Sequence, residues 1–485
     1  MQNIKHLRKR QKGSFRERLL RKLGLFIAVF LGVKLFFSLP GLTQQPVTIT
    51  FLMGAPTIAS WKPAIAEFEA KNPDIRINVV EGPNATNLLE DLYTSAFLLG
   101  GSPYDLVYMD IVWVPKFAAG GWLMELSERF PKEEQAEFLR GDLEGGRYKG
   151  GLYRVPVRSD AGMLYYRKDL LEQAGFQPPE TFAELMQAAQ ALQKQGAARF
   201  GYLWQGRQYE GTPAMFVEIL QGYGGFWIKP DTLEVGLDRP ESIQALEFLV
   251  NTIEKGVSPP SVVTYQEEET RRLFHNGEAV FLRNWPYVWE LAQKDSPVRG
   301  KIGIKPMPHA PGYDSGACQG GWGWGISKTT KYPEQAWRAV EFFASKESQR
   351  QVTLDTGYLP TRRSLYSDPE IVQKYSHFPA MLKVLDNAAL RPPIAQYAQA
   401  SDILQRYLTA AFTRELSPQK AMQAAANETR RLLGIATAEA VRTPSARYLQ
   451  SHLVNRSNLI QFFTDSTFYP RPALLNFIEV WGIGR

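Results

Sequence analysis

The sequence predicts an α/β protein built from two lobes. Its 485 residues exceed the usual size of one domain, and a composition of 44% apolar and 22% charged residues is typical of a folded chain. From Pro46 onwards, short apolar runs alternate with amphipathic helices. That alternation predicts parallel strands with helices on both faces of the sheet.

The first lobe begins with a strand over 47–53, a helix over 61–71 and a second strand over 75–80. A helix over 88–99 and a buried strand over 105–109 follow. Asn72-Pro73 ends the first helix, because proline disfavours continuation of a helix. Ligands of parallel sheets bind beyond the carboxyl ends of the strands, and Asp110 falls at such an end.

The second lobe is expected to start near Val155-Pro156-Val157. Thr181-Phe182-Ala183-Glu184 is a capping box, which opens a helix that ends near Gly196. Pro240 suits the first turn of another helix, which Gly256 ends. Further strands are expected over 201–204, 279–283 and 302–306.

The first residues are expected to form an export segment. Residues 1–34 carry a net charge of +9, whereas the whole chain carries +7. The remaining residues therefore carry 7 − 9 = −2. The basic balance therefore does not indicate nucleic-acid binding. An apolar run over 23–33 follows the basic residues and extends, interrupted by Lys34, to residue 42. We predict either a cleaved signal or a retained signal-anchor over residues 1–45.

Cysteine and histidine usage argues against a metal or cofactor. Cys318 is the single cysteine, which excludes an intrachain disulfide and a diacylglyceryl anchor, and it is expected to be a small buried residue. The five histidines are scattered singly. No phosphate-binding loop, nucleophile elbow or zinc motif occurs, so the sequence predicts no catalytic residues.

Several residues instead suit the binding of a neutral sugar. Ionised planar groups satisfy paired hydroxyls, and flat aromatic rings cover the apolar face of a pyranose. The predicted polar contacts are Asp110, Asp160 and Arg391, and the predicted stacking surfaces are Trp285, Tyr287 and Trp322. Glu267-Glu268-Glu269, by contrast, is expected to form a solvated helix face.

These motifs resemble the trehalose/maltose-binding branch of the family 1 extracellular solute-binding proteins, which serve ABC importers. The likeness covers about residues 47–434 in consistent order. It is carried by Val155–Leu171, Trp204–Gly211, Arg283–Tyr287, Gly320–Trp322, Gly357–Thr361 and Arg391–Pro393.

The resemblance implies the two-lobed periplasmic-binding-protein fold of type II, with hinged lobes, a mainly parallel sheet in each and the ligand cleft between them. Lobe 1 would comprise 47–157 and about 307–355, and lobe 2 would comprise 158–306 and about 356–434. It also assigns Asp110 and Asp160 as hydroxyl-binding carboxylates, Trp285 with Tyr287 as the stacking pair, and Gly321-Trp322 as the facing wall, with Arg391 as a late arginine. Residues 435–485 lie beyond the likeness, and no role is assigned to them.

The chain departs from the family pattern at three places. No acid follows Gly54-Ala55-Pro56, Leu88-Leu89 stands where an arginine pair often opens the second helix, and Arg158 replaces a common tyrosine. Two charged contacts are thus absent and one, Arg158, is added to the predicted ligand-binding set. The ligand remains open between trehalose, maltose, sucrose and glucosylglycerol types.

The sequence thus predicts a monomeric periplasmic receptor that binds a small neutral sugar without a cofactor and delivers it to the transmembrane subunits of an ABC permease. The N-terminal segment would contact the membrane if it is not cleaved. Two alternatives stay open. One is a membrane-tethered sugar-sensing or scaffolding module, and the other is a glycoside hydrolase, which also uses carboxylates and tryptophans.

Overall fold

The computed structural model describes residues 45–294 and 296–435, and it divides them into two compact units. Unit 1 contains the chain up to Ala161 together with Gln319–Asp386, and unit 2 contains Gly162–Cys318 and the chain from Asn387 onwards. Apart from residues 45 and 435, the predicted export segment and C-terminal extension lie outside the described residues.

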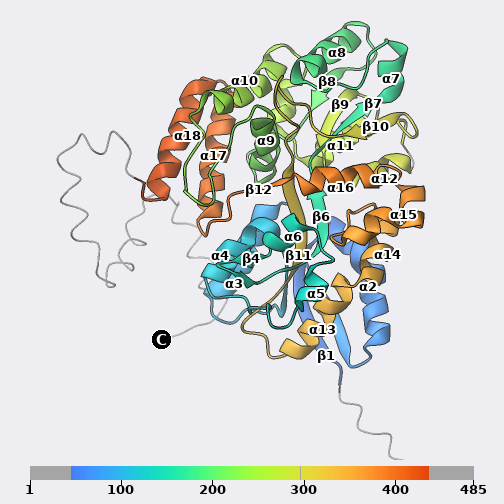
Figure 1. Cartoon of the computed structure of the whole chain (residues 1–485), viewed down its shortest axis with the longest axis vertical. Helices are drawn as coiled ribbons and strands as arrows, with labels where there is room; N and C mark the ends of the chain where they lie inside the picture. The colour runs from blue at the N-terminus through green and yellow to red at the C-terminus, as the bar shows by residue number, and fades with distance from the viewer. Residues whose placement is uncertain (1–44, 295, 436–485) are drawn as a thin grey trace, which may run out of the picture. The chain divides into compact units, whose positions relative to one another are not determined.

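Unit 1 combines helices and strands from both of its chain segments (Figure 1). Its strands are β1 (Val47–Gly54), β2 (Ile75–Gly82), β3 (Leu106–Asp110), β4 (Arg147–Tyr148), β5 (Gly151–Leu152), β6 (Val155–Ala161) and, from Gln319 on, β11 (Cys318–Ile326). Its helices are α2 (Ala55–Lys71), α3 (Thr86–Leu98), η1 (Ile111–Trp113), α4 (Val114–Ala119), α5 (Lys132–Gln135), α6 (Arg140–Glu144), α13 (Pro333–Ala344), α14 (Lys346–Thr356), η3 (Arg363–Ser367), α15 (Pro369–Lys374) and α16 (Phe378–Asp386).

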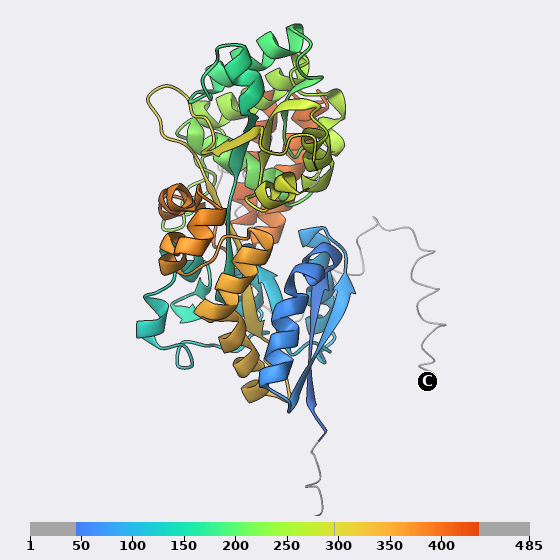
Figure 2. The same ribbon diagram turned by 90° about the vertical axis from the view of Figure 1, so that its right-hand side faces the viewer.

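An aromatic core holds the two segments of unit 1 together. The indole of Trp61 on α2 makes edge contacts with Tyr108 on β3, Trp324 on β11 and Phe343 on α13, with ring centroids 5.5–5.8 Å apart. Phe51 on β1 meets Trp324 in the same way at 4.7 Å. Edge-to-face pairs add stability beyond the area they bury. Helices α13 and α14 accordingly lie beside α2, although they come about 270 residues later in the chain (Figure 2).

Unit 2 is built in the same manner from a small sheet and surrounding helices. Its strands are β7 (Met163–Arg167), β8 (Phe200–Leu203), β9 (Ala279–Asn284), β10 (Ile302–Lys305) and β12 (Ala389–Leu390). Its helices are α7 (Lys168–Gln173), α8 (Phe182–Lys194), α9 (Gly211–Gly222), α10 (Pro240–Glu254), η2 (Pro260–Thr264), α11 (Glu267–His275), α12 (Val288–Gln293), α17 (Tyr397–Phe412) and α18 (Pro418–Leu432). The capping box predicted at Thr181 is present at the start of α8.

The strand pairings correct one expectation. We expected a mainly parallel sheet in each lobe, but within the described residues β1 with β2 and β8 with β9 pair in parallel, whereas most other strand pairs are antiparallel. Strand β11 runs antiparallel to β3 and β6, and β7 runs antiparallel to β9 and β10. The local β-α-β pattern is correct for β1, α2 and β2. It does not extend to the pairing of β3, whose ladder partner β11 comes from far along the chain and runs antiparallel to it.

The places where the chain changes units also lie later than the lobe boundaries proposed from the sequence. The chain leaves unit 1 after Ala161, re-enters it after Cys318 and leaves it again after Asp386. Strand β6 stays paired with β11 as far as Ala161, which keeps residues 158–161 with unit 1. Helix α15 packs against α14, which keeps the segment after residue 355 there as well.

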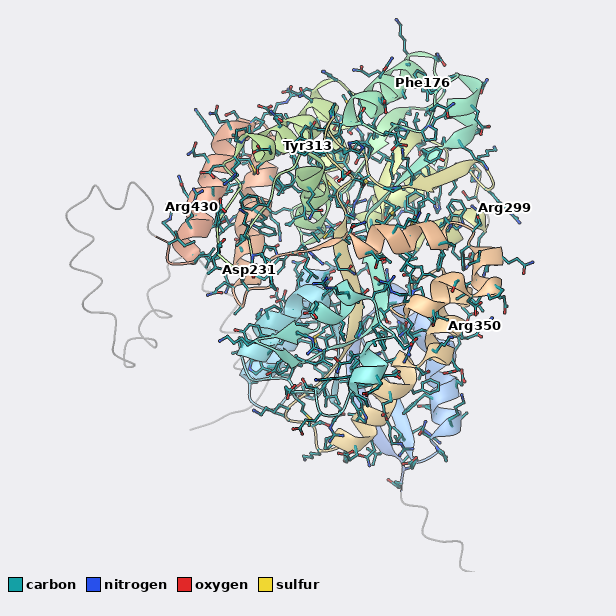
Figure 3. The ribbon with its side chains drawn as sticks, viewed as in Figure 1. Phe176, Asp231, Arg299, Tyr313, Arg350 and Arg430 are labelled. Carbon is teal, nitrogen blue, oxygen red and sulfur yellow. The ribbon has the colours of Figure 1, made fainter. Side chains whose placement is uncertain are left out.

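Two arginines stabilise unit 2 in different surroundings. Arg283 on β9 is fully buried and forms an ion pair with the equally buried Glu218 on α9, with Nε 2.7 Å from Oε2. At the surface, Arg430 on α18 donates to both carboxylate oxygens of Asp238 at 2.7 and 2.8 Å (Figure 3). The second pair fixes the last described helix to the loop before α10.

Cys318 is buried, as predicted, and burial raises the pKa of its thiol to about 12. Within residues 45–294 and 296–435, none of the helices is long and apolar enough to cross a bilayer. The apolar run predicted as a signal or anchor falls before that part of the chain.

We predict that Glu218→Gln lowers the free energy of unfolding of the protein by about 3 kcal/mol, because it leaves the Arg283 charge buried without its counter-charge. Chemical denaturation followed by circular dichroism measures the change. The matched control is Glu334→Gln, which breaks the ion pair of an exposed glutamate with Arg129 and should cost far less, because solvent screens an exposed pair. Equal costs for the two variants would contradict the prediction.

Candidate functional site

Four predicted ligand-binding residues lie together on one face of the unit 1 sheet. In the register of the strands, Trp322 on β11 is opposite Asp110 on β3 and also opposite Arg158 on β6. Directly opposed residues point their side chains to the same face of a sheet, and so does Asp160, two residues after Arg158. We call Asp110, Trp322, Arg158 and Asp160 the polar row.

The Trp322 indole is half-buried and backed by other aromatic rings. Tyr108 stacks on it with ring centroids 5.0 Å apart and an interplanar angle of 14°, and Trp113 meets it edge-on at 5.7 Å. Beside it, Asp110 ends β3 and accepts a hydrogen bond from the Val112 amide at 3.2 Å, which caps η1. The strand end thus holds a carboxylate and a fixed indole side by side, which is the pairing that a sugar hydroxyl and a sugar ring require.

Arg158 and Asp160 form a two-point ion pair within β6. Arg158 Nε lies 2.8 Å from Asp160 Oδ2, and Nη2 lies 3.3 Å from Oδ1. Burial disfavours the charge of Arg158, but the attraction of Asp160 outweighs that penalty, so the pKa of Arg158 is raised. The guanidinium also lies over the ring of Tyr358, 3.8 Å from its centroid. Arg158 and Asp160 were predicted as separate ligand contacts, and their pairing with each other was not predicted.

Gly321 has a structural role that does not depend on a ligand. Its φ of 140° is disfavoured for residues with a side chain, and a Cβ here would lie 2.7 Å from the carbonyl oxygen of Arg158 and 2.8 Å from Oδ1 of Asp142. The glycine therefore lets β11 pass close to β6 and α6. Whether its backbone also contacts a ligand, as predicted, stays a prediction.

The predicted stacking pair of unit 2 occupies the turn between β9 and α12, and we call Trp285, Pro286 and Tyr287 the aromatic turn. The hydroxyl of Tyr165 on β7 donates to the carbonyl oxygens of Trp285 and Pro286, which lie 2.9 and 3.1 Å away. These contacts fix the backbone of the turn. The Arg283 guanidinium covers one side of the Trp285 ring, 4.1 Å from its centroid. Both aromatic side chains are half-buried.

The first turn of α11 orients these two rings, which the sequence did not indicate. Trp285 Nε1 donates to Glu267 at 3.2 Å, and the Tyr287 hydroxyl donates to Glu268 at 2.8 Å. Burial raises the pKa of Glu268, but hydrogen bonds from Arg271 and Tyr287 outweigh it, so the pKa is lowered. Glu267 and Glu268 are thus partly buried acceptors, and the expected solvated face is wrong for them. A pair of glutamates followed by an arginine three residues later carries no signal that would have revealed their partners.

Arg391 lies in a different polar cluster of unit 2. Its Nη1 donates to Glu210 at 2.6 Å, and the hydroxyls of Tyr397 and Ser401 donate to the same carboxylate. The Arg391 side chain is 3% exposed. The cluster joins the loop before α9 to the first turn of α17, so Arg391 has a clear structural partner. Its predicted contact with a ligand stays a prediction.

Within the described residues, no group of three histidine, cysteine, aspartate or glutamate side chains is arranged to hold a metal ion. The site residues offer carboxylates, guanidinium groups and aromatic rings. Such groups bind hydroxyl-bearing and apolar faces of a ligand by hydrogen bonds and stacking.

Comparison with known proteins agrees with this chemistry. The family model of the bacterial extracellular solute-binding proteins matches residues 54–350. The chain belongs to this family. The fold is therefore that of the type II periplasmic sugar-binding proteins, as the sequence predicted.

Three relatives illustrate the family. A probable ABC transporter-binding protein of Deinococcus radiodurans is 30% identical over 76% of this chain and 89% of its own length. A maltotriose-binding protein of Pyrococcus abyssi is 27% identical over 63% of this chain and 64% of its own length. The solved structure of T. maritima MalE3 with bound maltose superposes with a TM-score of 0.76 and 36% identity, covering 80% of this chain and all of that one.

Asp142 gives this solute-binding protein a pH-dependent stability. Burial is the largest cause that raises the pKa of Asp142, the attraction of Arg154 offsets part of it, and the pKa reaches about 7. The unfolded chain releases this proton near pH 4, so the folded protein binds one proton more between about pH 4 and 7. The contribution of Asp142 to the free energy of unfolding therefore decreases as the pH rises from about 4 to 7 and is constant above that range.

We predict that raising the pH from 5 to 8 lowers the free energy of unfolding of the wild-type protein by about 3 kcal/mol more than that of Asp142→Asn, which cannot titrate at this position. Thermal or urea unfolding at several pH values measures both slopes. Parallel pH profiles for the two proteins would show that Asp142 does not hold a proton in the folded state.

Proposed function

We propose that this solute-binding protein captures a neutral di- or oligosaccharide, or a related glycoside, and delivers it unaltered to the permease of an ABC importer. The observation that carries the proposal is the polar row, in which a strand-end carboxylate, a half-buried indole and an arginine–carboxylate pair share one face of a sheet. The maltose in the related T. maritima protein and the maltotriose named for the P. abyssi protein support the same ligand class.

The aromatic turn supplies the second part of the proposed binding chemistry. Its rings are fixed by hydrogen bonds at their polar atoms, to Glu267 for Trp285 and to Glu268 for Tyr287. An aromatic ring that is already oriented loses little entropy when a sugar stacks on it. Micromolar affinity requires about −8 kcal/mol, which a few charge-assisted hydrogen bonds and stacked rings can supply.

Release of the sugar without cleavage is part of the proposal. A glycosidase needs one carboxyl group that donates a proton and another that acts as base or nucleophile. In the polar row, Asp160 accepts a hydrogen bond from Arg158 Nη2 at one oxygen and lies within ion-pair distance of Arg158 Nε at the other, which suits a fixed acceptor better than a proton donor. We also propose that the protein is periplasmic and monomeric. Where the apolar N-terminal segment is retained, it would attach the protein to the inner membrane.

Ligand-induced thermal stabilisation tests the ligand class. We expect the unfolding midpoint to rise with at least one of maltose, trehalose, sucrose or glucosylglycerol, because a ligand that binds only the folded state stabilises it by mass action. Amino acids, an oligopeptide and inorganic phosphate serve as controls. A rise with the controls alone would overturn the proposed function.

The aromatic turn is tested by Trp285→Ala. We expect the variant to lose at least about tenfold in affinity for the sugar that stabilises the wild type, because it removes a stacking surface worth about 1.5 kcal/mol or more, and to keep its circular dichroism spectrum. Tyr313→Ala, which removes an aromatic ring that is 45% exposed in the same unit, is the matched control and should retain its affinity (Figure 3). Calorimetric titration measures both. Wild-type affinity in Trp285→Ala would remove the aromatic turn from the site.

A further inference from the structure

The ring of Tyr358 is covered on one face. The Cζ atom of Arg158 lies 3.8 Å from the centroid of this ring, and the Tyr358 hydroxyl lies 3.3 Å from Ser60 Oγ on α2. A guanidinium at that distance occupies the surface on which a sugar ring would stack. Tyr358 is therefore an aromatic residue beside the polar row that packs against the hydrophobic core of unit 1 and has one ring face covered by a guanidinium.

The Arg158 guanidinium is held in place over the Tyr358 ring. Arg158 is bound by Asp160 from the same strand through two contacts of 2.8 and 3.3 Å, and the two side chains are 10% and 6% exposed. A cation over an aromatic ring is stabilised more when both are shielded from water. Because Asp160 and Tyr358 hold the guanidinium from two directions, its displacement by a sugar would break an ion pair and a ring contact together.

The covered ring also lies next to the stacking surface of the row. Arg158 is directly opposite Trp322 in the register of β6 and β11, so the two side chains are neighbours on one face. Trp322 is backed by Tyr108 and remains half-buried. A sugar chain that stacks on Trp322 and continues towards β6 meets a charged guanidinium before it reaches the ring of Tyr358.

We infer that Arg158 determines the length of the oligosaccharide that this receptor accepts. By covering Tyr358, it leaves the polar row with a single stacking surface, so a short ligand is favoured over a longer one that would need a second ring on this face of the unit 1 sheet. The inference rests on the proposed function and adds the ligand length to it. It assigns Arg158 a part in specificity that differs from a simple hydrogen bond to a hydroxyl.

The test compares maltose, maltotriose and maltotetraose by calorimetric titration of the full-length wild-type protein and of Arg158→Lys. Lysine keeps a cation for Asp160 but has no planar group to cover a ring. We expect the affinity for maltotetraose relative to maltose to rise about fivefold in the variant, the gain from one newly opened stacking surface. The gain should vanish in the double variant Arg158→Lys/Tyr358→Leu.

Arg362→Lys is the matched control. Arg362 is also a nearly buried arginine of unit 1 that lies over an aromatic ring, with Cζ 4.6 Å from the centroid of Phe138, and it forms an ion pair with Glu134. It is not part of the polar row. Its replacement reports the general effect of losing a stacked guanidinium, and the ratio of the two affinities should stay at the wild-type value.

Tyr358→Leu alone gives a second test in which the Arg158–Asp160 pair is intact. Because the ring face is covered in the wild type, its removal should change the maltose affinity by less than about twofold. A tenfold or greater loss of maltose affinity in Tyr358→Leu would overturn the inference. So would an unchanged ratio of maltotetraose to maltose affinity in Arg158→Lys, provided that the wild type binds maltose. Either result would leave the proposed function standing. If the wild-type protein binds none of the three sugars while other neutral sugars stabilise it, the length inference alone falls. If no neutral sugar binds, both fall.

Discussion

The pairing of β11 with strands on both of its sides is the constraint on which the polar row depends. The register of the two strand pairs places Asp110 opposite Trp322 on one side of β11 and Arg158 opposite it on the other side. A shift by one residue would turn every one of these side chains to the opposite face. Gly321 makes the close pairing possible, because a larger residue would collide with the Arg158 carbonyl oxygen.

In unit 2, hydrogen bonding fixes the aromatic turn more than ladder register does. The backbone of the turn is bonded to the Tyr165 hydroxyl, and the two rings are bonded to the glutamates at the start of α11. Beneath them, Arg283 contacts Glu218, Gln205 and the ring of Trp285. Buried polar networks of this kind stabilise one arrangement of side chains when every member is satisfied. The rings are therefore oriented before a ligand arrives.

The sequence predicted those features that depend on near neighbours. The capping box at Thr181 was correct because both of its hydrogen bonds join residues three apart. The single cysteine was correctly predicted to be buried. These patterns repeat over a few residues, so they can be recognised without knowing the fold.

The contacts that shape the candidate site join residues far apart in the chain. Strand β3 was expected to pair in parallel with its neighbours, but its partner β11 follows about 210 residues later. Arg158 and Tyr358 are separated by 200 positions, and neither carries a local pattern that points to the other. Family resemblance supplied the residues of the row, whereas their pairing and the cover over Tyr358 required coordinates.

The chemistry of the single cysteine has a practical consequence. Cys318 has no exposed surface, and its thiol pKa of about 12 leaves almost no thiolate at neutral pH. Alkylating and maleimide reagents should therefore leave the native protein unmodified. Two cysteines introduced at exposed positions would then be the only reactive thiols. A pair of dyes could be attached to them, and the motions of the receptor could be followed in single molecules without first removing a natural residue.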